Sequence, residues 1–264
     1  MKESLAIVGF NFNTTSIIYE SFLLLEKSLD KEYDFFMFDN GSKEMPLTED
    51  FNDTRITLIC KPHNEGFTKG MEYLFDFFIE NDEYKTVLVF TASTRFLLDV
   101  NYENELQLIN RELYKSTRAL GYISSAIIGL HAINSQNKQT YHSDSKIKTV
   151  WNNQTLATIY DLNFIQHCKR LRMAFYNQNL SYGWGVEMDL YLLAKSYGYV
   201  HGYFTSMPVY WIRNYTSVQN GTQSIYHKNA GKEVSKYLAS MSIIRGLFLR
   251  YSRFIPKFIL RNLS

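Results

Sequence analysis

The first 90 residues alternate strand-like and helix-like segments four times, and this alternation constrains the fold more than any other feature. Apolar runs at 4–10, 35–38, 55–60 and 86–90 predict short buried strands. Between them, apolar residues spaced three and four apart over 16–29 predict a helix lying on a sheet, and a second helix is expected over 71–80. This order is typical of an α/β fold with a mostly parallel central sheet flanked by helices.

The middle of the chain continues the same domain. Residues 121–130 predict a further strand, residues 134–148 an exposed loop, and residues 151–162 a strand and a turn. We find no repeat, linker or low-complexity tract, so we predict one domain over 1–235.

The composition indicates a folded protein of the reducing cytoplasm. A content of 45% hydrophobic and 16% aromatic residues supplies a large core and excludes global disorder. Cys60 and Cys168 read as buried thiols rather than as a disulfide or a metal motif. No run reaches the roughly 18 apolar residues of a membrane span, and the amino end does not read as a signal peptide.

The net charge of +2 hides an uneven distribution of charge. Residues 241–264 carry five basic side chains and no acidic one, and removing those five leaves 23 basic against 26 acidic residues in the body. The body is therefore slightly acidic, and we expect no nucleic acid as a partner.

Polar residues follow each of the four predicted strands. Asn11, Asp39, Asn64 and Thr91 all fall where a strand ends, and the carboxyl ends of parallel strands meet at the edge where α/β sheets bind ligands. Any one of these segments reads equally well as an ordinary turn. Their joint occurrence favours a binding edge.

A second polar locus lies at 181–199. Gly183 and Gly185 flank Trp184 in a turn, and the following helix over 186–195 carries Glu187 and Asp189 in its first turn, where the helix dipole favours anions. One interpretation is a capped helix with ordinary acidic residues. The other is a carboxylate held beside an aromatic surface.

Four segments in this order resemble a glycosyltransferase of the GT-A, Rossmann-like fold, closest to the inverting family 2 enzymes of bacterial polysaccharide synthesis. The resemblance covers roughly residues 4–200. IVGFNFN at 7–13 resembles the family's V-x-Y-N opening, FDNGS at 38–42 its V-D-N-G-S strand end, NEGFTKG at 64–70 its N-x-G-F-x-x-G segment, and GWGVEMDL at 183–190 its G-W-G and E-D-x-D-L region.

The resemblance implies a nucleotide-sugar donor, UDP- or dTDP-linked. Asp39 would accept from the imide N–H of the base or from a ribose hydroxyl. Lys69 would approach the phosphates, although a solvated lysine is an equal alternative, and Arg213 is a candidate for the diphosphate. The predicted donor-binding residues are Phe10, Asn11, Asn13, Asp39, Asn40, Asn64, Gly66, Lys69, Thr91, Ser93 and Arg95.

An inverting transfer needs a base that deprotonates the attacking hydroxyl of the acceptor, here a glycan or a lipid-linked sugar. Glu187 is the predicted base and Asp189 the second choice, while a shift of the alignment by one residue would put Met188 there. We predict that Trp184, Gly185 and Trp151 bind the acceptor, with core packing as the alternative for Trp184. His201 and His227 read as ordinary histidines.

The family's acidic D-x-D motif, which holds Mg²⁺ or Mn²⁺, is replaced by Thr91-Ala92-Ser93-Thr94. Divalent ions of this kind usually take at least one carboxylate. Three alternatives follow: a metal-independent enzyme in which Arg95 or Lys69 balances the diphosphate, a carboxylate from elsewhere such as Asp99, or a domain that binds without catalysis. We favour the first, and predict no cofactor with certainty.

The last segment, 236–264, predicts an amphipathic basic helix with a kink at Pro256. Such a helix can lie in an anionic membrane interface, so we predict a cytoplasmic glycosyltransferase attached peripherally to the inner face of the membrane. Packing of the helix on the domain is the alternative. The alternative function is a catalytically silent GT-A domain that binds or assembles. A sugar nucleotidyltransferase is disfavoured, because FNFNTT stands where that class has a glycine-rich loop.

Overall fold

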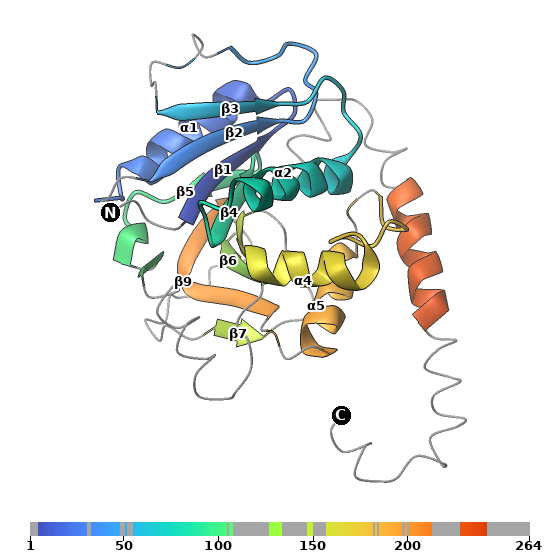
Figure 1. The fold of residues 1–264 in the computed structure, drawn as a ribbon. Coiled ribbons are helices and arrows are strands. Elements are labelled where there is room, and N and C mark those ends of the chain that lie inside the picture. The colour runs from blue at the N-terminus through green and yellow to red at the C-terminus, as the bar shows by residue number, and fades with distance from the viewer. Residues whose placement is uncertain are drawn as a thin grey trace.

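A computed structural model describes residues 5–30, 33–47, 51, 55–104, 106–107, 127–133, 147–149, 157–181, 183, 185–196, 199, 201–212 and 228–241. Within these ranges, nine strands form one sheet in the order β3-β2-β1-β4-β8-β6-β9-β5, with β7 paired to β9 (Figure 1).

The first four strands are parallel and form one half of the sheet. They are β1 (Leu5–Asn11), β2 (Asp34–Asp39), β3 (Ile56–Cys60) and β4 (Thr86–Thr91). Asn11 lies opposite Asp39, which lies opposite Cys60, and Phe10 lies opposite Thr91. The four predicted strands are therefore confirmed, and their polar ends share one edge, which we call the carboxyl edge.

The other half of the sheet is mixed. β8 (Ala157–Asp161) runs antiparallel between β4 and β6 (Ile127–Ile133), and β6 is parallel to β9 (His201–Trp211). The short strands β5 (Thr94–Phe96) and β7 (Ile147–Thr149) pair antiparallel with β9. The α/β fold with a mostly parallel sheet is confirmed, with β8 as an antiparallel insertion.

One face of the sheet is covered by α1 (Thr15–Glu26). Its buried residues Ile18, Phe22 and Leu25 pack on a core that includes Ile7 and Phe90. The approach is close at Gly9, where a Cβ atom would lie 2.2 Å from Ile18 Cγ2. A larger residue at this point of β1 would push α1 off the sheet.

The opposite face is covered by α2 (Phe67–Asn81), α4 (Leu162–Arg172) and α5 (Val186–Ser196) (Figure 1). Phe75 of α2 packs against Tyr160 of β8 and against Phe175, with ring centroids 4.9 and 5.2 Å apart. α2 begins four residues before the predicted start. The pattern at 151–162 did not predict α4, whose amino end is capped by the Asp161 side chain, which accepts from Asn163 N and Phe164 N.

A further helix over 228–241 lies beside α5 (Figure 1). Val234 and Tyr237 pack on the same core as α5. The predicted domain boundary after residue 235 falls inside this helix, and the rest of the predicted tail, 242–264, lies outside the described residues. None of the described helices is long and apolar enough to cross a bilayer.

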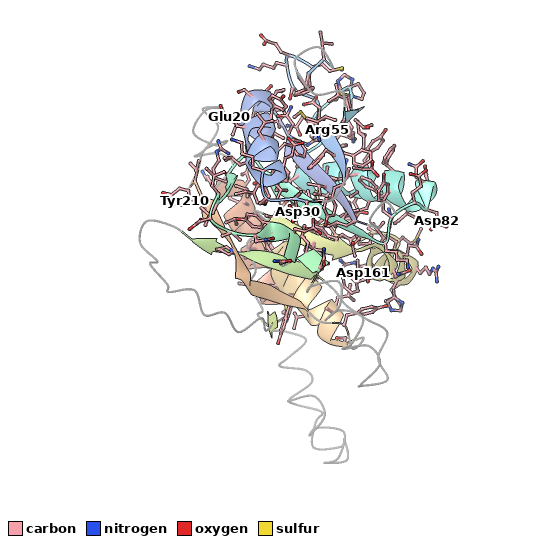
Figure 2. All side chains as sticks on the ribbon, turned by 90° about the vertical axis from the view of Figure 1, so that its left-hand side faces the viewer. Glu20, Asp30, Arg55, Asp82, Asp161 and Tyr210 are labelled. Carbon is pink, nitrogen blue, oxygen red and sulfur yellow. The ribbon has the colours of Figure 1, made fainter. Side chains whose placement is uncertain are left out.

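Asp30, Asp82 and Asp161 mark the opposite, amino edge of the parallel strands, which faces the viewer in Figure 2. Asp30 follows α1, Asp82 follows α2, and Asp161 lies opposite Thr86 at the start of β4. The residues predicted to bind the donor lie toward the other, carboxyl edge.

Candidate functional site

The ends of β1 and β2 are joined by a buried hydrogen-bond network. Asn11 Nδ2 donates to Asp39 Oδ1 at 2.7 Å, and Asn11 Oδ1 accepts from Thr14 N at 3.0 Å. Asp39 Oδ2 accepts from Ser42 N at 2.9 Å, and Asp39 Oδ1 also accepts from the Ser42 hydroxyl. Asn11 and Asp39 are fully buried. The structure therefore gives Asp39 the role of fixing this turn, and its contact with a nucleoside stays a prediction.

The turn after β2 touches the loop after β3 through Gly41. Gly41 has φ +73°, and a Cβ atom on it would lie 2.3 Å from the His63 carbonyl carbon and 2.4 Å from Asn64 N. Both the backbone conformation and the contact exclude other residues. The glycine of the FDNGS motif is thus explained by the proximity of two loops.

Asn40 links the same two loops by hydrogen bonds. Asn40 Nδ2 donates to Asn64 Oδ1 at 3.1 Å and to Gly66 O at 3.2 Å, and Gly66 N donates to Asn64 Oδ1 at 2.8 Å. Three of the residues predicted to bind the donor are thereby brought together. Lys69 lies one turn further along α2 and is exposed.

Phe10 contributes packing rather than an open surface. It is 7% exposed, and its ring lies 5.2 Å from Phe38 and 5.3 Å from Phe67, measured between centroids. Asn13 is different, because it lines an open cleft of about 1170 Å³. The lining of this cleft comes from 13–17, Tyr19, Glu20, 43–46, Phe51 and Arg95.

The turn between β4 and β5 holds the remaining predicted donor residues. Thr91 and Ser93 are half-buried. Arg95 Nη1 donates to Ser21 Oγ at 3.0 Å and to Thr94 O at 2.8 Å, so its guanidinium lies toward α1. Asp99 is exposed beyond β5, and the nearby Glu103 N donates to Ser28 O after α1. The alternative of Asp99 as a substitute metal ligand stays a prediction.

No cluster of three or more His, Cys, Asp or Glu side chains suited to a metal ion occurs in the described ranges. Hydroxyl groups are weak ligands for Mg²⁺ or Mn²⁺ without a carboxylate. Metal independence therefore stays a prediction.

The turn that precedes α5 packs on the amino end of α2. Thr68 Oγ1 donates to Ser181 O at 3.1 Å, and a Cβ atom on Gly183 would lie 3.0 Å from Phe67 Cδ1. Gly183 and Gly185 have φ +83° and +80°, as a tight turn requires. Segments more than 100 residues apart thus meet. Trp184, Trp151 and Arg213 lie outside the described residues.

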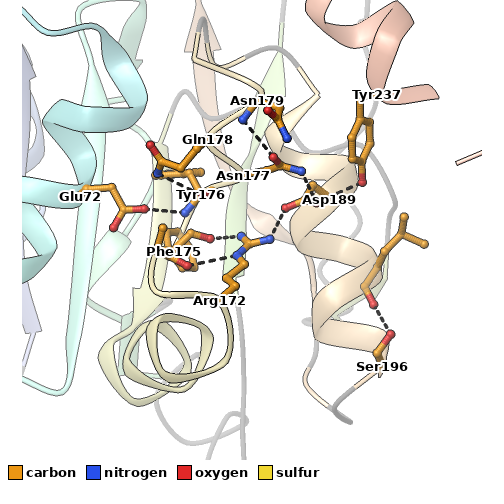
Figure 3. Close-up of polar contacts among 12 residues, drawn as sticks. Glu72, Arg172, Phe175, Tyr176, Asn177, Gln178, Asn179, Asp189, Ser196 and Tyr237 are labelled. Carbon is orange, nitrogen blue, oxygen red and sulfur yellow. Dashed lines mark hydrogen bonds and ion pairs between the residues drawn. The ribbon is translucent and has the colours of Figure 1, made fainter. Parts of the chain in front are cut away.

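Asp189 is held by three donors from three segments (Figure 3). Arg172 Nη1 donates to Asp189 Oδ2 at 2.6 Å, Asn177 Nδ2 to Oδ1 at 3.2 Å, and Tyr237 Oη to Oδ1 at 3.1 Å. Burial, and then the Asp189 carboxylate, raise the pKa of Tyr237. Asp189 therefore ties α5 to α4 and to helix 228–241, and sequence analysis missed these partners because they are distant along the chain.

Glu187 lies on a different side of α5, because residues two apart on a helix point about 200° apart. Burial, and to a lesser degree the charge of Glu187, raise the pKa of Tyr160 and of Tyr176. The hydroxyl oxygens of these two buried tyrosines are 3.3 Å apart. Glu187 therefore lies on another side of α5 than Asp189, whose carboxylate accepts from Arg172, Asn177 and Tyr237.

The Arg172–Asp189 ion pair is expected to contribute to stability. The Asp189 side chain is only 11% exposed, and in Arg172→Met its carboxylate keeps only the neutral donors Asn177 and Tyr237. We therefore expect a loss of about 2 kcal/mol in the free energy of unfolding. Arg170→Met, an exposed arginine of the same helical turn, is the matched control and should change it by less than about 0.5 kcal/mol. Urea unfolding measures both, and equal losses would contradict the assigned role of the pair.

No family model and no curated protein matches this chain. Solved structures of S. aureus TarS, a GT-A type glycosyltransferase, resemble it in fold. TarS 1–349 has a TM-score of 0.54 at 12% identity over 81% of this chain and 61% of that one. Its complex with UDP has a TM-score of 0.52 at 14% identity over 80% and 60%. The complex with UDP-GlcNAc has a TM-score of 0.50 at 13% identity over 80% and 58%.

The chain spans about three fifths of the length of these structures. At such low identity the likeness shows the fold alone. It confirms the GT-A type of fold that the sequence predicts, while the assignment to family 2 stays a prediction. This chain has a GT-A-like fold.

Proposed function

We propose that this protein is a glycosyltransferase that moves a sugar from a UDP- or dTDP-linked donor to a glycan or a lipid-linked acceptor. The observation that carries the proposal is the joining of the loops after β1, β2 and β3 to Ser181, Gly183 and the first turn of α5. That first turn carries Glu187 and Asp189, and we call it the acid-bearing turn. Asn40 donates to Gly66 O. The first residues of α2, which follow Gly66, contact Ser181 and Gly183. The fold shared with TarS, which was solved with UDP and with UDP-GlcNAc, supports the same function.

In this proposal the donor lies along the carboxyl edge. Asn64 and Lys69 are exposed polar groups there, and Asn13 and Ser93 are half-buried. Asn11, Asp39 and Asn40 are buried and hold the turns in place from below. The glycines at 41 and 66 allow the loops to approach one another and the ligand. The nucleoside is thus recognised by a surface whose shape depends on buried side chains.

Glu187 is the proposed base of an inverting transfer. Its carboxylate takes the proton of the acceptor hydroxyl as that oxygen forms a bond to the anomeric carbon, and the bond from this carbon to the nucleoside diphosphate breaks. The electron pair of the broken bond leaves with the diphosphate. Asp189, which is engaged by three donors, keeps the first turn of α5 in position.

The charge of the leaving diphosphate needs a counterion. We propose that cations of the chain provide it, with Lys69, Arg95 and Arg213 as candidates. The sequence 91–94 carries no carboxylate that would hold a divalent ion in the family's usual place. Nucleotide binding that is unaffected by a chelator is the corresponding expectation.

The second candidate function is a silent GT-A domain that binds a nucleotide or a partner without turnover. The missing carboxylates at 91–94 favour it. Donor binding without release of nucleoside diphosphate, in the presence of Mn²⁺ as well as of EDTA, would support this candidate.

Calorimetric titration with UDP and dTDP, first with EDTA and then with Mn²⁺, tests the proposal. We expect binding of one nucleotide regardless of the metal. Asp39→Asn is expected to weaken this binding at least about 10-fold, because an amide has only one acceptor oxygen. The bonds from Asn11 Nδ2 and from Ser42 N, which use the two oxygens of Asp39, then cannot both persist, and the turn loosens.

Asp34→Asn is the matched control, because it makes the same change at the amino end of the same strand, where Asp34 accepts from the Tyr84 hydroxyl. This variant should bind the nucleotide as the unmodified protein does. Thermal melting of both variants separates unfolding from a local effect. Absence of binding to any nucleotide by the unmodified protein would overturn the proposed function.

A further inference from the structure

Helix 228–241 has an inner face that holds the acid-bearing turn. Ala230 is fully buried, and Val234 and Tyr237 pack on the core that contains α5. A Cβ atom on Gly185 would lie 3.3 Å from Val234 Cγ2. Tyr237 bonds Asp189, and Glu233, the one acidic residue of this helix, accepts from the Ser181 hydroxyl at 2.6 Å.

The outer face of the same helix is a ridge of lysines. Lys228, Lys232 and Lys236 are exposed and lie four residues apart, so they form one stripe about 12 Å long. This stripe lies opposite Ala230, Val234 and Tyr237 around the helix. None of the three lysines forms an ion pair with any residue that the structure describes. Leu238, 44% exposed, adds apolar surface beside them.

The sequence that continues from the helix has the same charge. Residues 242–264 contain five basic side chains and no acidic one. Unpaired cations repel one another and are stabilised near a surface of negative charge. The charge of the ridge and of the following sequence therefore matches an anionic phospholipid surface, to which each nearby lysine adds attraction within a Debye length.

We propose that the lysine ridge of helix 228–241 docks on an anionic membrane and thereby places the acid-bearing turn of α5 at the bilayer surface. The part that concerns the acid-bearing turn rests on the proposed function, because it presumes an acceptor that the membrane presents. The docking itself depends only on the charge and exposure of the ridge. One face of the helix contacts lipid headgroups, and the other face positions Asp189.

The test is sedimentation of the full chain with vesicles of phosphatidylcholine alone and with vesicles that also contain phosphatidylglycerol, at low salt. We expect binding to the anionic vesicles only. The double variant Lys232→Glu and Lys236→Glu should lower the partition coefficient by about 30-fold or more, since each lysine near such a surface contributes roughly fivefold.

The matched control is Lys27→Glu with Lys85→Glu, two exposed lysines at the amino edge, which changes the net charge by the same amount. We expect it to lower the partition coefficient less than about threefold. Equal losses in the two variants, unchanged binding of the ridge variant, or no vesicle binding by the unmodified protein would each overturn the proposal.

Nucleotide titration of the same proteins separates the membrane-docking proposal from the glycosyltransferase proposal. A ridge variant that loses vesicle binding and keeps nucleotide affinity supports docking by this helix. Vesicle binding that depends on the ridge in a protein that binds no nucleotide would uphold the docking surface and overturn the glycosyltransferase proposal. Thermal melting confirms that the exposed substitutions leave the fold intact.

Discussion

Glu187→Gln is expected to lower the turnover number by about 10²- to 10⁴-fold, the usual effect of losing a positioned general base. Glutamine keeps the size of the side chain but cannot accept the proton of the acceptor hydroxyl. Nucleotide affinity should change less than about twofold, because the proposed donor site is formed by the loops at the carboxyl edge and not by α5. Release of nucleoside diphosphate from the sugar nucleotide measures the first quantity, and calorimetry measures the second.

Two further variants sharpen this experiment. Glu80→Gln, an exposed glutamate at the end of α2, is the matched control and should retain full activity. Asp189→Asn should lose stability as well as activity, because it weakens the pair with Arg172. The role of base would pass to Asp189 if Glu187→Gln kept its full turnover number while Asp189→Asn was stable but inactive.

Gly41→Ala is expected to lower the free energy of unfolding by at least about 3 kcal/mol. Alanine at φ +73° costs about 1 kcal/mol, and its Cβ would lie 2.3 Å from a backbone carbon of the loop after β3, so that this loop must move. Urea unfolding followed by circular dichroism gives the free energy. If the Gly41→Ala protein folds, we expect it to bind nucleotide more weakly than the unmodified protein. The reason is that the hydrogen bond between Asn40 and Asn64 depends on the same close approach of the two loops.

Gly231→Ala is the matched control, since it is the same substitution inside helix 228–241, where a Cβ would have no atom within 4 Å. Alanine in a helix interior is favoured over glycine, so we expect a gain of about 0.5–1 kcal/mol. A similar effect of the two substitutions would show that the loops at the carboxyl edge can separate, and would contradict the role assigned to Gly41.

Local patterns predicted the parallel half of the fold well. The strand predicted over 35–38 is one residue shorter than β2 at each end, and the strand predicted over 86–90 is one residue shorter than β4 at its carboxyl end. Each is a short apolar run that ends in a polar turn, which makes its bounds easy to predict. α4 was not predicted, since its residues 162–172 have too few apolar side chains for a clear helical pattern. The cap at Asp161 and the basic last turn were the available signals.

For the predicted site residues, local sequence predicted the turns on which they lie but not their hydrogen-bond partners. FDNGS indicated a turn with an acid at a strand end, and this turn is present. That Asp39 is buried and bonded to Asn11 depends on the pairing of β1 with β2, which no local pattern specifies. The same holds for Asp189, whose first turn was predicted and whose partners Arg172 and Tyr237 were not.

The sequence by itself determined the alternation of strands and helices, the polar strand ends and the two acids at the start of α5. These follow from side-chain periodicity and turn chemistry, which act over a few residues. Only the tertiary structure decided that β8 lies between β4 and β6, that Gly66 meets Ser181, and that Glu187 and Asp189 have different surroundings. Such contacts join segments up to more than 100 residues apart, and they arise when the whole core packs at once.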